Sequence, residues 1–312
     1  MSPQKKLNLI CFPGAPNLPI FVGIKFGLFE AVGLDIQLET TPSSIYQIEN
    51  LVKGNFHVAG TAFDNVVAYR EGQGPIAFDE PPDLVAFMGA TRIELSFVVS
   101  PDIGTYEDLK GCSIALDALA TGFAFVLYDM MERAGLSIDD CNLVPVGATP
   151  KRWESVRSGE HAGTLTIEPF TSIAIANGFR VLQSSLNTMP NYQGGIFAAN
   201  RAWAANNAEK IDSFIKGYLT SLEWTLDPNN YEEAKEILLK NMPAIKPGVA
   251  DAVMQKLLNP ATGLTPAGEM NIAGIDAVLG LRSRYAKPLK QLLDHSAYID
   301  LNAYKNIEKF HR

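Results

Sequence analysis

Short apolar runs alternate with longer segments of helical pattern along the first two thirds of the chain. Leu7–Phe12 reads as a strand, and the turn-rich loop Pro13–Pro19 leads into a helix over Ile20–Ala31. Gly33 is placed to end this helix, because glycine is favoured just past a helix C-terminus. Leu34–Thr40 then reads as the next strand. Strands that alternate with helices in this way predict βαβ units and a mainly parallel sheet.

The alternation continues in a second series, which indicates two α/β units. Further strands are predicted over 56–61, 84–89, 95–99, 112–117, 143–146 and 162–167. Beyond Asn207 the chain becomes helical, and apolar residues recur at the i, i+3, i+4 spacing of one helix face. This stripe consists of Ile211, Phe214, Ile215, Tyr218, Leu219 and Leu222. Its regular spacing predicts packing against a core.

The composition is that of a globular chain, since the 312 residues are 47% hydrophobic and 19% charged. The formal net charge of −8 argues against nucleic acid or an anionic membrane as a partner. No apolar stretch reaches roughly 18 residues, so no membrane insertion is expected. The run Leu7–Phe12 is too short for the core of a signal peptide. The sequence as it stands predicts a cytoplasmic location, or a periplasmic or extracellular one if a leader has been removed.

The cysteines and histidines give no sign of a metal site. Cys11, Cys112 and Cys141 are an odd set without close spacing, so neither a zinc site nor a disulfide framework is predicted. We interpret them as small buried hydrophobic residues, and three free thiols fit a reducing compartment. The four histidines have no ligand spacing. The sequence therefore predicts no metal and no cofactor.

Several segments resemble, in order, the type II periplasmic substrate-binding proteins of the sulfonate, taurine and thiamine-pyrimidine-synthase branch. Ile24–Leu38, with the sequence IKFGLFEAVGLDIQL, is the most specific of them. The segment LVKGNFHVAGTAFDN at 51–65 resembles a strand and ligand loop of that family, although His57 stands where an acidic residue is usual. TYEDLKGCSIAL at 105–116, the segment 139–163 and the segment 200–224 extend the resemblance over most of the chain.

The resemblance implies a two-lobed α/β fold with a hinge cleft and a helical C-terminal region. The first lobe is then discontinuous, over residues 1–91 and 200–312, and the second lobe covers residues 92–199. Strand C-termini and helix N-termini of both lobes face such a cleft. Five loops are expected there, at residues 13–17, 42–44, 62–65, 118–122 and 168–171.

The candidate site residues come from these loops and from the expected first crossover between the lobes, near Gly89–Glu94. The ligand-binding candidates are Pro16, Asn17, Ser43, Ser44, Phe63, Asp64, Asn65, Arg92, Thr121, Gly122 and Glu168. A structural role is open for several of them. Ser43, Ser44 and Asp64 are also suited to capping helices, and Phe63 to packing in a core. Arg92 is placed either to pair an anionic ligand or to form a hinge ion pair with Glu94 or another acid.

Two functions remain open. The first is solute binding for an ABC-type uptake system, with one small organic molecule as ligand and an ABC permease as partner if the chain is exported. The second is a cytosolic enzyme on the same scaffold, such as a lyase, decarboxylase or dehydratase, with Glu168 or Asp64 as the proton carrier. Burial at a strand end is expected to raise the pKa of Glu168. Asp64, Asp117 and Glu168 accompany Arg92, Lys151 and Arg152 in the expected cleft, so the sign of the ligand's charge stays open.

Overall fold

The computed structural model describes residues 5–309 and contains two five-stranded sheets. The first sheet has the order β2-β1-β3-β10-β4, and the second has the order β7-β6-β8-β5-β9. The strands of the first sheet are β1 Lys5–Cys11, β2 Leu34–Thr40, β3 Val58–Ala62, β4 Leu84–Thr91 and β10 Gly195–Asn200. The strands of the second sheet are β5 Ser96–Val99, β6 Ser113–Leu116, β7 Asn142–Pro145, β8 Gly163–Thr166 and β9 Arg180–Ser184.

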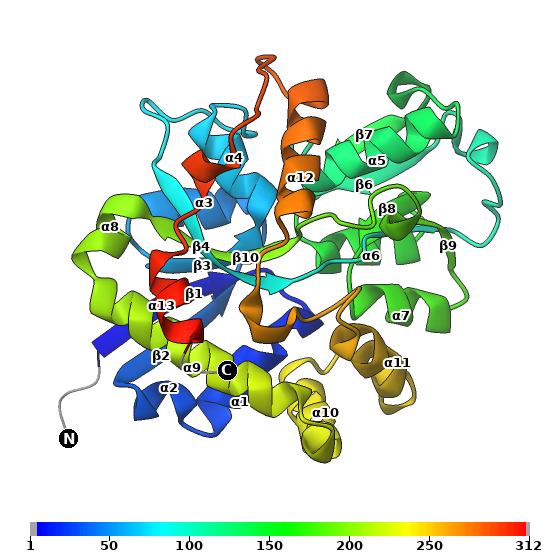
Figure 1. Cartoon of the computed structure of the whole chain (residues 1–312). Helices are drawn as coiled ribbons and strands as arrows, with labels where there is room; N and C mark the ends of the chain where they lie inside the picture. The colour runs from blue at the N-terminus through cyan, green and yellow to red at the C-terminus, as the bar shows by residue number, and fades with distance from the viewer. Residues whose placement is uncertain (1–4, 310–312) are drawn as a thin grey trace.

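Both sheets repeat one pattern of strand directions. In the first sheet β1 is parallel to β2 and β3, and β10 runs antiparallel to β3 and β4. In the second sheet β6 is parallel to β7 and β8, and β5 runs antiparallel to β8 and β9. The chain passes from the first sheet to the second after β4 and returns before β10 (Figure 1). The carboxyl ends of the parallel strands therefore face the region between the sheets.

Helices cover the faces of both sheets and connect their strands. Their bounds are α1 Leu18–Lys25, α2 Leu28–Ala31, α3 Ser44–Val52, α4 Phe63–Arg70, α5 Gly122–Arg133, α6 Thr149–Arg157, α7 Phe170–Ala176, α8 Arg201–Asn206, α9 Ala208–Leu226, α10 Tyr231–Asn241, α11 Pro247–Leu258, α12 Ile272–Tyr285 and α13 Asn302–Glu308. The single helix predicted over Ile20–Ala31 is instead two helices. Gly27 separates them at a φ of 66°, a left-handed conformation that an α-helix cannot contain.

The predicted apolar stripe of the long helix α9 is confirmed as core. All six of its residues are buried, with Phe214, Ile215 and Tyr218 fully enclosed. They pack in one cluster with residues of β1, β10 and α1. Each enclosed side chain of this size contributes roughly 1.5–3 kcal/mol through burial. This cluster fixes the C-terminal helices to the first sheet.

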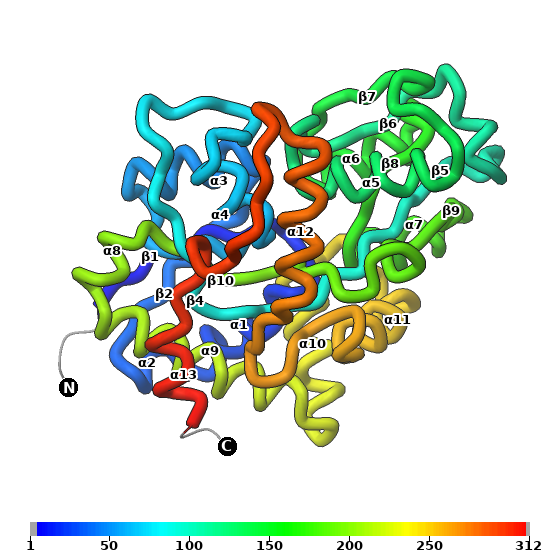
Figure 2. The backbone as a smooth tube through the Cα atoms, turned by 45° about the horizontal axis from the view of Figure 1, so that its top comes forward, coloured from blue at the N-terminus to red at the C-terminus, as the bar shows by residue number. Residues whose placement is uncertain are grey.

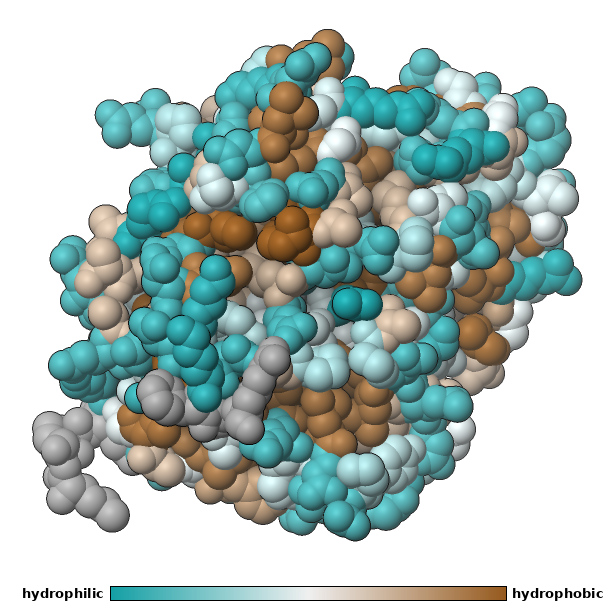
Figure 3. Space-filling model, viewed as in Figure 1, coloured by the Kyte–Doolittle hydropathy of each residue, from teal (hydrophilic) through white to brown (hydrophobic). Residues whose placement is uncertain are grey.

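Helix α12 has a different place, because it stands between the two halves of the molecule (Figures 1 and 2). Its residues Ile275, Val278 and Leu279 belong to a core cluster that includes Val66 of α4 and Phe125 of α5. The C-terminal region thus contacts both sheets' helices. On the face shown in Figure 3, polar residues surround smaller apolar areas. Among the described residues, no helix combines the length and apolar character needed to cross a membrane.

Candidate functional site

A cavity of about 100 Å³ lies between the two sheets. This is several times the roughly 10–15 Å³ that one water molecule needs. Both sheets contribute to its wall, through residues at the ends of β1, β3, β4, β6 and β8 and through the first turns of α4, α5 and α6. Much of the wall is apolar. Its apolar side chains include Phe12, Ile93, Phe123, Ile167, Ile196 and Phe197.

Six of the eleven candidate residues line this cavity. They are Pro16, Asn17, Asp64, Asn65, Thr121 and Gly122. Asn17 is anchored by its side-chain amide, which donates to the Phe12 carbonyl at 2.8 Å. Asn65 donates to the Thr61 hydroxyl at 2.9 Å. Thr121 caps α5, since its hydroxyl accepts from the Ala124 amide. The fold thus brings together residues that lie more than a hundred positions apart.

Asp64 is held in the most enclosed polar contact of the cavity wall. Both of its carboxylate oxygens accept from Nη1 of Arg282, at 2.7 and 2.8 Å, and Oδ2 also accepts from the Gly122 amide at 2.6 Å. Asp64 and Arg282 are 1% and 0% exposed. Arg282 also donates to Gln73 and lies 5.1 Å over the ring of Phe125. One carboxylate therefore joins α4, α5 and α12.

The sequence interpretation missed Arg282. A signal for it exists, because Ile275, Val278, Leu279 and Arg282 follow the i, i+3, i+4, i+7 spacing of one buried helix face. A charged residue on such a face needs a buried partner of opposite charge. The partner lies 218 positions away, and nothing in the spacing identifies it.

Asp117 is the second carboxylate of the cavity wall, and its partners are incomplete. It directly follows β6, and its Oδ2 accepts from the Ser44 amide at 3.3 Å. Its Oδ1 is buried without a hydrogen-bond partner among the described residues. The Thr91 hydroxyl, which also lines the cavity, is likewise buried and unpaired within the described part of the chain. Buried polar atoms almost always have a partner, so these two oxygens mark positions where a bound molecule or water completes the bonding.

Arg152 brings a positive charge to the same part of the cavity. It is 3% exposed, and its guanidinium donates to four neutral acceptors. These acceptors are the hydroxyls of Thr149 and Thr164 and the carbonyls of Gly147 and Leu165. Burial lowers the pKa of Arg152 to about 10, and the nearby Asp117 opposes this shift. Since Asp64 is paired with Arg282 and Asp117 offsets Arg152, the wall has no formal net charge.

Hydrogen bonds across the cleft connect the two sides of the cavity wall. The Ala15 amide donates to the Glu168 carbonyl at 3.1 Å, and the Ala148 amide donates to the Pro42 carbonyl at 3.0 Å. Together with the bonds of Asp64 and Asp117 described above, they connect elements of the first sheet with elements of the second. A molecule inside the cavity is therefore enclosed on several sides.

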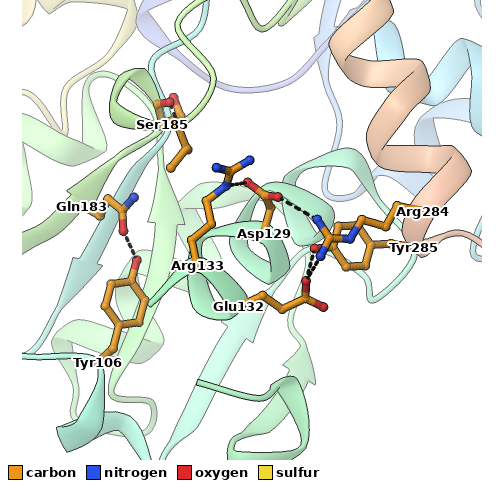
Figure 4. Close-up of polar contacts among 9 residues, drawn as sticks. Tyr106, Asp129, Glu132, Arg133, Gln183, Ser185, Arg284 and Tyr285 are labelled. Carbon is orange, nitrogen blue, oxygen red and sulfur yellow. Dashed lines mark hydrogen bonds and ion pairs between the residues drawn. The ribbon is translucent and has the colours of Figure 1, made fainter. Parts of the chain in front are cut away.

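Polar contacts also fix α12 to α5 (Figure 4). Asp129 is buried and accepts from Arg133 at 2.6 Å and from Arg284 at 3.3 Å. Glu132 accepts from Arg284 and from the Tyr285 hydroxyl. The two helices are thus joined by a charge network beside the buried Asp64–Arg282 pair, and this network is partly exposed to solvent.

Arg92 and Glu168 line a smaller neighbouring pocket of about 20 Å³. Arg92 makes no ion pair with Glu94, because Glu94 pairs with Lys256 at 2.6 Å and accepts from the Ser184 hydroxyl. Nε of Arg92 is buried and unpaired within the described residues. Burial raises the pKa of Glu168 to about 7, although its contact with Ser172 acts in the opposite direction. Glu168 is therefore the carboxylate whose protonation changes near neutral pH.

The remaining candidates lie outside the cavity lining. Ser43 caps α3, because its hydroxyl accepts from the Tyr46 amide at 3.2 Å. Ser44 is buried beside it and contacts Asp117 through its backbone amide. Phe63 is fully buried and meets the ring of Tyr298 edge-on. The described residues contain no group of three His, Cys, Asp or Glu side chains that could hold a metal ion.

Comparison of the sequence with known families gives a match to one of them. The family described as NMT1/THI5 like matches residues 16–231, more than half of the chain. The chain belongs to the NMT1/THI5-like family. This match includes β2–β10, α1–α9 and all six candidate residues that line the cavity. A comparison with the curated proteins found no match.

The NMT1/THI5-like chain is also similar in fold to many solved structures. A protein from Bordetella bronchiseptica RB50 is 18% identical with a TM-score of 0.82, and 98% of each chain is covered. The alkanesulfonate-binding protein SsuA from Xanthomonas axonopodis pv. citri, bound to MOPS, is 16% identical with a TM-score of 0.76, covering 96% of this chain and 100% of that one. The aliphatic sulphonate binding protein SsuA from Escherichia coli is 19% identical with a TM-score of 0.69, over 99% and 100%. The expected type II periplasmic-binding-protein fold is confirmed.

Proposed function

We propose that this chain is a solute-binding protein of an ABC-type uptake system and that it encloses one small organic molecule in the cavity between its sheets. The observation that carries the proposal is the cavity between the sheets, whose wall contains two buried oxygens, on Asp117 and Thr91, that have no hydrogen-bond partner among the described residues. We take the lobes to be residues 1–91 with 200–312 and residues 92–199. The strand β10, which belongs to the first sheet, lies across the second boundary between them. Closure of such lobes around a hinge excludes water from the ligand.

The cavity chemistry favours a ligand with no net charge, a partly apolar body and an N–H donor. A donor is needed because Oδ1 of Asp117 is an acceptor that finds no partner within residues 5–309. An anionic ligand would bring a second negative charge to this carboxylate, and like charges in a partly desolvated site repel strongly. The apolar wall of Phe12, Ile93 and Phe197 matches the body of the molecule.

Three probes that share one ring separate these ligand classes. We expect benzamide to raise the melting temperature of the purified chain, benzylamine to raise it less because of its net charge, and benzenesulfonate to leave it unchanged. For Asp117→Asn, the benzamide concentration that gives the same rise in melting temperature should be about tenfold higher or more. The lost charge weakens the contact with the donor. Asp139→Asn, which changes an exposed carboxylate, should leave it unchanged. A larger shift with benzenesulfonate contradicts the ligand class.

The uptake role requires the chain to be outside the cytoplasm, with an ABC permease as its partner. Fractionation of the producing cells, followed by N-terminal sequencing of the chain, tests this part separately. We expect a shortened chain in the exported fraction. An intact chain that starts at Met1 or Ser2 in the cytosol contradicts uptake and directs attention to catalysis.

The properties of Glu168 favour an enzyme as the second candidate function. Its pKa is raised to about 7 by burial, which suits an acid or base at neutral pH. It lines the smaller pocket beside the cavity, with Arg92 close by. Asp64 does not suit proton transfer, because Arg282 and Gly122 occupy its oxygens. If a lyase activity is found, Glu168→Gln should abolish turnover without unfolding the chain, and unchanged turnover removes Glu168 from the mechanism.

A further inference from the structure

Cys112 and Cys141 lie side by side, although 29 positions separate them along the chain. Cys112 directly precedes β6 and Cys141 directly precedes β7, and these parallel strands pair Ser113 with Asn142. Backbone bonds continue the pairing on both sides of the cysteines, from the Asn142 amide to the Cys112 carbonyl at 2.8 Å and from the Gly111 amide to the Asp140 carbonyl at 2.7 Å. The two cysteines therefore lie opposite each other, each one position before the neighbouring strands β6 and β7.

The separation of neighbouring strands suits a disulfide. Strands in a sheet lie about 4.8 Å apart, and disulfides join residues whose Cα atoms are about 4.4–6.8 Å apart. Residues that face each other in register also direct their side chains to the same face of the sheet. The backbone of Cys112 and Cys141 therefore has the spacing and direction that a bond between their sulfur atoms requires.

The positions of the sulfur atoms agree with the register. Sγ of Cys112 lies 3.4 Å from the carbonyl oxygen of Asp108, and Sγ of Cys141 lies 3.2 Å from that of Leu109. These carbonyls belong to consecutive residues of the short 3-10 turn Glu107–Leu109. Burial raises the pKa of Cys141 to about 11, and the proximity of Cys112 adds to the shift. Both thiols thus meet the same turn.

The turn is held in place, and it leaves both cysteines half-buried. The Tyr106 hydroxyl, just before the turn, donates to the side chain of Gln183 in β9 (Figure 4). Cys112 and Cys141 are partly exposed, whereas Cys11 is 1% exposed and burial raises its pKa to about 12. Oxidants in solution can therefore reach the pair but not Cys11.

We propose that Cys112 and Cys141 are a dithiol site that forms an intramolecular disulfide when the chain meets a disulfide oxidant. One thiolate attacks a sulfur of the oxidant, which releases the first oxidant thiol and forms a mixed disulfide. The second thiolate attacks the protein sulfur of that intermediate and releases the second oxidant thiol. The protein loses two electrons and two protons, and the two released thiols carry them.

The bond would close a segment that contains part of the cavity wall. Residues 112–141 include Asp117, Thr121 and the helix α5. A disulfide that closes a segment of this length stabilises the folded chain, and in a chain of this size the melting temperature should rise by on the order of 5 °C. Formation of this disulfide is independent of the identity of the ligand and of the proposed function.

Oxidised glutathione is the probe, applied to the folded full-length chain at pH 8. Trypsin cleaves after Lys110, Arg133 and Lys151, so Cys112 and Cys141 fall in separate peptides, 111–133 and 134–151. We expect mass spectrometry without reductant to find these peptides joined, with two hydrogens lost from their summed mass. Dithiothreitol should separate them and reverse the rise in melting temperature.

Cys112→Ser and Cys141→Ser should each abolish the joined peptide and the rise in melting temperature, and Cys11→Ser should retain both. Glutathione attached to both cysteines without a joined peptide would overturn the proposal, as would unreacted thiols in the folded chain. A joined peptide that forms only in concentrated urea would also overturn it, because the folded register would then play no part.

Discussion

The two carboxylates of the cavity wall, Asp64 and Asp117, occupy similar places and have different surroundings. Each follows the end of a buried strand, β3 for Asp64 and β6 for Asp117. The oxygens of Asp64 are occupied by Arg282 and Gly122, whereas Oδ1 of Asp117 has no partner among the described residues. Burial of a charge therefore does not by itself mark a ligand site. A buried acceptor that lacks a hydrogen-bond partner, such as Oδ1 of Asp117, does mark one.

The largest expected effect on stability concerns Asp64, the carboxylate whose two oxygens both accept hydrogen bonds. Arg282→Met leaves Asp64 buried without its partner, and we expect a loss of about 3–5 kcal/mol in the free energy of unfolding. Urea denaturation measures the loss. The double variant Asp64→Asn with Arg282→Met should recover most of it, because no isolated charge remains. A loss below about 1 kcal/mol in the single variant would mean that the pair does not stabilise the contact between α4 and α12.

Glu168 is an intermediate case, since it is half-buried beside Ser172 and lies near the charges of Lys256 and Glu94. Its pKa is raised from 4.5 to about 7 in the folded chain, so the folded state binds the extra proton between these values. Stability should therefore fall as the pH rises from about 4.5 through 7, by on the order of 3 kcal/mol in total.

Urea denaturation at a series of pH values measures this dependence. The free energy of unfolding of Glu168→Gln, whose side chain cannot ionise, should change less with pH over that range than that of the parent chain. An identical pH dependence in the two proteins would assign the effect to other groups.

Gly122 tests how closely the two halves meet at Asp64. A methyl group at this position would lie 2.5–2.6 Å from Cγ and Cβ of Asp64 and from the hydroxyl of Tyr192. We expect Gly122→Ala to lower the free energy of unfolding by about 1–3 kcal/mol, because packed atoms must move. Gly280→Ala is the matched control, since its methyl group meets nothing within 4 Å. Equal unfolding midpoints of the two variants would contradict the close approach.

The smallest expected effect on stability belongs to Asp117. Asp117→Asn keeps the size of the side chain and its bond with the Ser44 amide, so the free energy of unfolding without ligand should change by less than about 1 kcal/mol. The binding of benzamide should nevertheless weaken. A large loss of stability with unchanged binding would reverse the roles assigned to the two carboxylates.

Much of the fold could be predicted from the sequence because its strands are short apolar runs between helices. The strand β9 was missed, since Arg180–Ser184 is a half-exposed edge strand without apolar alternation. The strand β10 lies at the expected return from residues 92–199 to the first lobe, and the lobe bounds alone do not indicate a strand there. The helix after the first strand was predicted in one piece because its apolar pattern continues through Gly27, whose left-handed backbone conformation ends α1.

The candidate site was only partly predictable, because sequence patterns indicate residue types at strand ends and not their partners. The loop positions of Asn17, Asp64 and Gly122 follow from the alternation of strands and helices. The pairing of Asp64 with Arg282, 218 positions away, depends on how α12 packs between the two halves. The spacing of the cysteines along the chain likewise does not identify their partners. Their spacing predicted no disulfide, and the strand register places Cys112 opposite Cys141.

Native mass spectrometry of the chain isolated from its own cells tests directly whether the cavity beside Asp117 binds a small molecule. We expect a complex with one small molecule, which dissociates to the bare chain on collisional activation. Asp117→Asn, isolated in the same way, should be bare or nearly so, while Asp139→Asn should retain the molecule. A bare parent chain, or equal occupancy in the parent and Asp117→Asn, would contradict the assignment of the cavity beside Asp117 as the binding site.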